Sequence, residues 1–128
     1  MGCDIHGWVE IKQGDKYIAI SEIDGKARIR NYDRFAKLAG VRSSGLSETP
    51  KPLGIPDDIS DTVRYWIDDW AEDGHSHSYL PLKDAADIFL ETDYGQSEFD
   101  RLCPVSSYFD FEYEGKVDDC RLVFWFDN

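Results

Sequence analysis

The two ends of the chain constrain the fold most, because apolar side chains recur at alternate positions in both. Near the N-terminus, Ile5, Val9 and Ile11 fall on one side of an extended segment over residues 4–12. Near the C-terminus, every second residue from Cys120 to Phe126 is apolar. A period of two is typical of a strand with one buried face. The sequence therefore predicts strands at both ends of the chain.

Each terminal strand has a turn and a second alternating segment beside it. A turn over residues 13–16 leads into residues 17–23, and residues 108–113 precede residues 120–126 across a glycine-containing turn. Short turns between alternating segments are typical of β-hairpins. We therefore expect an N-terminal and a C-terminal hairpin.

Helical spacing of apolar residues predicts three helices between the hairpins, over residues 31–40, 59–70 and 83–91. Asn31 is the expected N-cap of the first helix, and Asp57 and Asp58 are the expected caps of the second. Strands at the ends with helices between them favour an α+β fold, in which an antiparallel sheet built from the two hairpins is backed by two or three helices. The length of 128 residues predicts a single domain over residues 1–128.

The charge of the chain is strongly negative and uneven. The formal net charge is −12, but residues 1–50 hold eight basic and seven acidic residues, so the excess lies in residues 51–128. Phosphate neutralisation requires Lys and Arg, so direct DNA binding is not expected. An acidic chain is attracted to basic surfaces instead.

No apolar run approaches the roughly 18 residues that a transmembrane helix needs, and the start of the chain lacks the pattern of a signal peptide. We therefore expect neither a membrane partner nor export. The three cysteines (Cys3, Cys103 and Cys120) show no framework spacing, which is typical of reduced thiols in a cytosolic protein.

Acidic residues accumulate along and around the second predicted helix. The set comprises Asp57, Asp58, Asp61, Asp68, Asp69 and Glu72. One interpretation is a solvated helix face. The other is a partner-binding face that imitates a phosphate backbone and docks on a basic groove. The sequence leaves both interpretations open.

All three histidines lie in paired motifs of metal-ligand residues. Asp4 and His6 form D-x-H on the first strand, and His75 and His77 form G-H-x-H after the second predicted helix. In extended chain, residues i and i+2 share one face. One carboxylate and three imidazoles suit zinc or another divalent transition metal. Cys3 is a possible fifth ligand, but alternation places it with Ile5 as a small buried apolar residue.

The same two motifs open and close the pattern of calcineurin-like metallophosphoesterases. The middle motifs of that family, G-D-x-x-D and G-N-H-[DE], are absent, so the similarity indicates metal binding more than hydrolysis. No fingerprint for nucleophilic catalysis is present, and no catalytic residue is predicted.

The chain also resembles a family of small proteins, found mostly in phage and prophage genes, that begin Met-Gly-Cys-Asp-Ile-His. The resemblance lies in residues 1–6, 30–32, Phe35, 38–42, 73–78 and 126–128. It implies action in the cytoplasm of a bacterial host and a metal held by the two histidine motifs. A metal-binding member that acts as a type II anti-CRISPR protein further implies inhibition of Cas9 or of its guide-RNA complex.

Two hypotheses follow from these features. The favoured one is an interaction protein, not an enzyme, that inhibits a host defence nuclease by occupying a basic surface, with a mainly structural metal. The alternative is a small metal-dependent hydrolase acting on a phosphodiester or nucleotide, with Arg28 or Arg30 binding phosphate.

Overall fold

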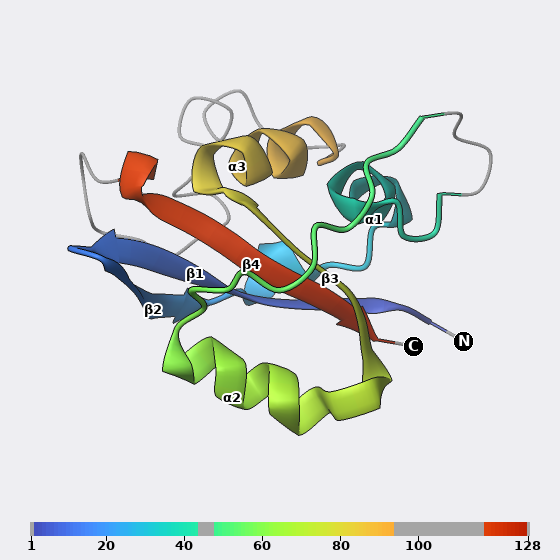
Figure 1. Ribbon diagram of the computed structural model, residues 1–128. Helices are drawn as coiled ribbons and strands as arrows, with labels where there is room; N and C mark the ends of the chain where they lie inside the picture. Colours follow the sequence, from blue (N-terminus) through green and yellow to red (C-terminus); the bar gives the residue numbers. More distant parts are fainter. Residues whose placement is uncertain (1, 44–47, 94–116, 128) are drawn as a thin grey trace.

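The computed structural model describes residues 2–43, 48–93 and 117–127 (Figure 1). Within them, four antiparallel strands form one sheet in the order β2-β1-β4-β3. The strands are β1 (Asp4–Gln13), β2 (Lys16–Glu22), β3 (Gly74–Pro81) and β4 (Cys120–Asp127). The helices are α1 (Tyr32–Ala39), α2 (Asp61–Trp70) and α3 (Leu82–Glu91), with short 3-10 turns at Gly25–Arg28, Ala71–Asp73 and Val117–Asp119. The predicted α+β class is confirmed.

The N-terminal strand β1 and the C-terminal strand β4 are neighbours in the middle of the sheet. The N-terminal hairpin forms as predicted, and Gly14 takes the left-handed conformation (φ 65°) that its tight turn requires. β4 lies between β1 and β3, so both of its sides are paired with described strands. Residues 108–113, the expected hairpin partner of β4, lie outside the described residues.

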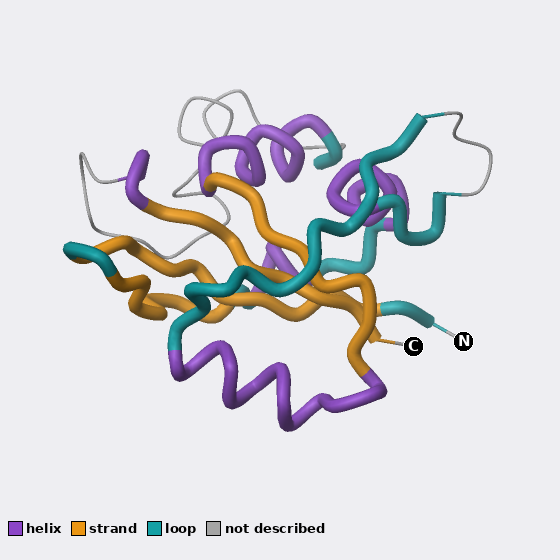
Figure 2. Tube along the Cα trace, in the orientation of Figure 1, coloured by secondary structure: helices purple, strands orange, loops and turns teal. Residues whose placement is uncertain are grey.

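Helices cover both faces of the sheet. α2 lies on one face, while α1 and α3 lie on the other (Figures 1 and 2). Leu122, Phe124 and Phe126 of β4 belong to the core under α1 and α3, whereas Val123 and Trp125 belong to the core under α2. β4 is therefore buried on both faces, which explains why its intervening residues are also largely apolar. None of the helices in the described ranges has both the length and the apolar character needed to cross a membrane.

The helix ends confirm one predicted cap and correct another. Asn31 caps α1 by accepting a hydrogen bond from the Arg34 amide at 3.0 Å, and Gly40 ends that helix with φ 73°. For α2, the prediction of Asp57 and Asp58 as caps is wrong. Ser60 is the N-cap, and its Oγ accepts from the Val63 amide at 3.4 Å. The helix begins at Asp61, later than the apolar pattern suggests, and its N-cap is therefore Ser60.

Two of the three cysteines lie in the core. Cys3 is fully buried in the cluster that contains Ile5, as the alternation predicted, and Cys120 is also buried. They form no disulfide with each other. Burial raises the pKa of Cys3 and raises that of Cys120 to about 11, so both thiols stay protonated. Cys103 lies outside the described residues.

Candidate functional site

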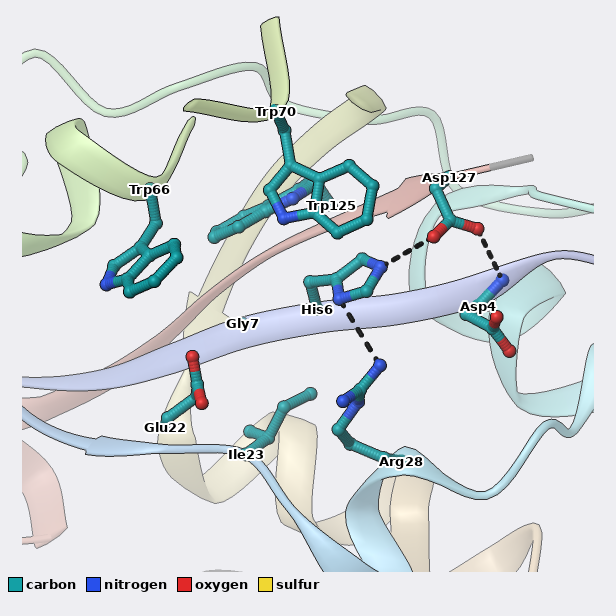
Figure 3. A pocket seen from close by; sticks show the side chains of 10 residues that line it. All are labelled: Asp4, His6, Gly7, Glu22, Ile23, Arg28, Trp66, Trp70, Trp125 and Asp127. Atoms are coloured by element: carbon teal, nitrogen blue, oxygen red, sulfur yellow. Dashed lines mark hydrogen bonds and ion pairs between the residues drawn. The ribbon is translucent and has the colours of Figure 1, made fainter. Parts of the chain in front are cut away.

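A pocket of about 470 Å³ lies where α2 crosses β1 and β4 (Figure 3). Its lining combines three indole rings with charged side chains from three strands and a 3-10 turn. The lining residues are Asp4, His6, Gly7, Glu22, Ile23, Arg28, Trp66, Trp70, Trp125 and Asp127. Aromatic walls with a few convergent polar groups are typical of ligand sites.

His6 lies at the centre of this pocket and is fixed on both ring nitrogens. Its Nε2 lies 2.8 Å from Oδ2 of Asp127, and its Nδ1 lies 3.4 Å from Nη2 of Arg28 (Figure 3). Because arginine can only donate, Nδ1 accepts and Nε2–H donates to the carboxylate. The Trp70 ring covers the imidazole at a centroid distance of 4.3 Å. The neutral Nε2–H tautomer satisfies both contacts.

Asp4 takes part in the site mainly through its backbone. Its amide donates to Oδ1 of Asp127 at 3.2 Å, across the β1–β4 pairing. Its own carboxylate accepts two hydrogen bonds from Arg30, at 2.9 and 3.1 Å. These bonds raise the pKa of the Arg30 guanidinium. As predicted, Asp4 and His6 lie on the same face of β1, but the Asp4 carboxylate is paired with arginine.

A bulge in β3 separates the other two predicted ligands. The pairing with β4 shifts register between His75 and Ser78, and Ser76 takes φ 55°. The expectation that His75 and His77 share one face is therefore wrong, because an extra residue reverses the alternation. The His75 ring lies near Phe126, in the core under α1 and α3, whereas His77 stacks on Trp125, under α2.

The two β3 histidines nevertheless keep unsatisfied nitrogens. Nε2 of His75, Nε2 of His77 and Nε1 of Trp125 are buried and have no hydrogen-bond partner among the described residues. Burial, and then the nearby His75, lower the pKa of His77, which favours its neutral form. A neutral imidazole with an open nitrogen, such as that of His77, fits the ligand chemistry of zinc.

As placed, the four predicted ligands do not surround one point. Both His6 and His77 lie beside the Trp125 indole, with centroid distances of 6.2 and 6.3 Å to it. A zinc ion requires ligand atoms within about 2.0–2.3 Å. In the described part of the chain, no three His, Cys, Asp or Glu residues cluster closely enough to hold a metal. The four-ligand zinc site remains a prediction.

The predicted acidic partner-binding residues are all exposed, but Asp58 differs from the rest. Asp58 accepts from Nη1 of Arg121 at 2.8 Å, and this hydrogen bond lowers the pKa of Asp58. The remaining acidic residues form no ion pair with another described residue: Asp57, Asp61, Asp68, Asp69 and Glu72. Asp58 therefore anchors the start of α2 to the sheet, and the others face solvent.

Sequence reasoning missed the pocket itself. The spacing that predicts a helix over residues 59–70 does not show that Trp66 and Trp70 line a pocket, and Asp127 is one of many acidic residues in the sequence. The available signal was the pairing of the two ends: if 4–12 lies beside 120–127, then Asp127 comes opposite Asp4 and Trp125 opposite His6. No protein-family model, curated protein or solved structure matches the chain.

Proposed function

We propose that the protein is an interaction protein that docks, through α2, onto a basic surface that otherwise binds nucleic acid. The docking surface is the acidic α2 face, defined here as Asp61, Tyr65, Trp66, Asp68, Asp69 and Glu72. Asp61, Tyr65 and Asp68 recur at i, i+4 and i+7, so they form one stripe along the helix. Val63 and Ile67 are buried on the opposite side.

The observation that carries this proposal is the exposure of two aromatic rings within the acidic α2 face. Tyr65 is 62% exposed and Trp66 is 36% exposed. Their rings contact each other edge to face, with 5.2 Å between the ring centroids. Tyrosine and tryptophan are enriched at the energetic centres of protein interfaces. Unpaired carboxylates around them supply charge complementarity toward a basic partner.

Two arginines of the N-terminal part, Arg30 and Arg34, are engaged by other described residues. Arg34 is buried and donates to Thr92 and to the Phe89 carbonyl, at 2.9 and 3.1 Å. Arg30 is paired with Asp4. These contacts support a structural role for Arg34, and for Arg30 a structural role over the phosphate binding that the hydrolase alternative assigns to it.

The hydrolase alternative has one supporting feature, the His6–Asp127 pair, which resembles a general base with its orienting carboxylate. A general base needs a free nitrogen lone pair. Here Nδ1 of His6 accepts from Arg28 while Nε2 binds Asp127, so both nitrogens are engaged. The pair therefore supports a positioning role in the pocket better than proton transfer.

Guide-RNA-loaded Cas9 is the first partner to test, because of the resemblance to phage proteins. We expect the protein to slow target DNA cleavage in competition with DNA. Inhibition should weaken as target DNA concentration rises, and as added salt screens the acidic face. The absence of inhibition would exclude this nuclease as the partner, and inhibition unaffected by DNA and salt would contradict docking through charge.

A further inference from the structure

We propose that the pocket under α2 receives the guanidinium group of an arginine side chain from the basic partner. The inference rests on the proposed function, because the pocket opens beside the acidic α2 face and shares Trp66 with it. Three indoles, those of Trp66, Trp70 and Trp125, provide aromatic walls for the guanidinium group, and the carboxylate of Glu22 provides the opposite charge.

The indoles provide the surface that a planar cation needs. Trp125 forms the buried wall at 1% exposed, Trp70 covers His6, and Trp66 stands at the solvent-exposed end. In Figure 3, Trp66 and Glu22 lie on opposite sides of the same end of the pocket, with the edge of Trp125 behind them. A cation over the face of tryptophan is attracted by the ring quadrupole, most strongly when it is partly desolvated.

Glu22 is the pocket carboxylate that remains available. Asp127 is engaged by His6, and Asp4 is engaged by Arg30. Glu22 is exposed and forms no ion pair with another described residue. A carboxylate facing an indole defines a site for a cation with a flat face.

The pocket's own cation lies at the other end. Arg28 donates to Nδ1 of His6 at 3.4 Å and, through Nε, to the Ile5 carbonyl at 3.3 Å. His6 and Ile23 lie between Arg28 and the Trp66–Glu22 end (Figure 3). A second cation therefore enters at the Glu22 end without approaching Arg28 directly.

Arginine fits this end better than lysine does. Its guanidinium is planar, stacks on aromatic faces and pairs bidentately with a carboxylate, whereas the ammonium of lysine is compact and strongly hydrated. Basic surfaces that bind nucleic acid use both lysine and arginine, and arginine is favoured where phosphate is recognised bidentately. The proposed docking therefore has a central anchor residue on the partner side.

The first test uses N-acetyl-L-arginine amide, titrated into the whole protein while the indole N–H signals are followed by NMR. The four tryptophans include Trp8, which packs in the α2-side core and does not line the pocket. We expect saturable shifts at Trp66 and Trp70, smaller shifts at Trp8, weaker binding of the lysine amide and none of the neutral citrulline amide. Equal effects of the citrulline amide, or lysine binding as tightly as arginine, would overturn the assignment.

The second test uses Glu22→Gln and Trp66→Leu, with Glu48→Gln as the matched control. Glu48 is exposed and does not line the pocket, so its variant loses the same charge elsewhere. We expect the arginine probe to bind about threefold more weakly to Glu22→Gln and roughly fivefold more weakly to Trp66→Leu, and unchanged to the control. Equal weakening in Glu22→Gln and Glu48→Gln would mean that net charge alone attracts the probe.

These probes separate the pocket from the docking proposal. Probe binding without any docking of the partner would leave the pocket assignment standing and contradict the proposed function. Partner docking that is unaffected by Glu22→Gln, together with no probe binding, would contradict the pocket assignment alone.

Discussion

At the scale of single residues, the buried ion pair between Glu10 and Arg121 could not be predicted from the alternation of apolar and polar residues. Glu10 is fully buried, and its Oε1 accepts from Nε of Arg121 at 2.7 Å. Its Oε2 accepts from the Ser60 amide at 2.8 Å. A glutamate in an alternating strand is expected to face solvent, and its partner lies far away in sequence. The contact exists because β1 and β4 pair and α2 covers both.

Glu10→Gln should destabilise the protein by about 3 kcal/mol, because it leaves a largely buried guanidinium without its closest carboxylate. Arg121 keeps Asp58, so the loss should stay near the lower end for buried pairs. Urea denaturation followed by circular dichroism measures the change. Glu48→Gln should change the free energy of unfolding by less than about 0.5 kcal/mol. Equal stability of the two variants would show that the Glu10–Arg121 pair contributes little.

The pocket, like the Glu10–Arg121 pair, could not be predicted from single residues. His6 was identified as chemically interesting from its motif, and the structure places it at the centre of the pocket. Its contacts with Asp127, Arg28 and Trp70 depend on three segments distant in sequence. Local patterns can nominate such a residue but cannot identify what surrounds it.

At the scale of elements, local signals predicted helices better than strand pairing. The Asn31 cap and the Gly40 stop of α1 are encoded within a few residues, so both could be predicted. The β3 bulge at Ser76 and the central place of β4 could not, because both depend on which strands pair. Because the bulge inserts one residue into β3, the side chains of His75 and His77 lie on opposite faces of the sheet.

The cap of α2 gives a test at this scale. Ser60→Ala should lower the free energy of unfolding by about 1 kcal/mol, because the Val63 amide loses its hydrogen-bond acceptor. Asp57→Ala, at one of the originally predicted cap positions, should have almost no effect. Thermal or urea denaturation of both variants measures this difference. A larger loss in Asp57→Ala than in Ser60→Ala would contradict the cap assigned by the structure.

At the scale of the whole molecule, the zinc prediction is that one metal ion joins Asp4 and His6 of β1 to His75 and His77 of β3. A four-ligand site predicts about one zinc per chain in the purified, untagged protein. It also predicts that the zinc is lost both in His6→Ala and in His75→Ala/His77→Ala. Elemental analysis of the three proteins measures this directly. Zinc retained in His6→Ala but lost in the double variant would exclude His6 as a ligand, and no zinc in any sample would contradict the prediction.

The layered architecture gives the protein two different outer sides. α2 carries the acidic stripe with Tyr65 and Trp66 on one face of the sheet, and α3 lies on the other face (Figure 1). α3 also bears exposed carboxylates, Asp84 and Asp87. The chain therefore contains its own control: the same change in charge can be made on either side of the sheet.

The central claim is that docking depends on the acidic α2 face and not on net charge. The decisive measurement compares the affinity of guide-RNA-loaded Cas9 for Asp68→Lys/Asp69→Lys with its affinity for Asp84→Lys/Asp87→Lys, after circular dichroism has shown both variants to be folded. The predicted result is at least a roughly tenfold loss of affinity for the α2 variant, with near-native binding of the α3 variant. Equal losses in the two variants, or a greater loss in the α3 variant, would contradict docking through α2.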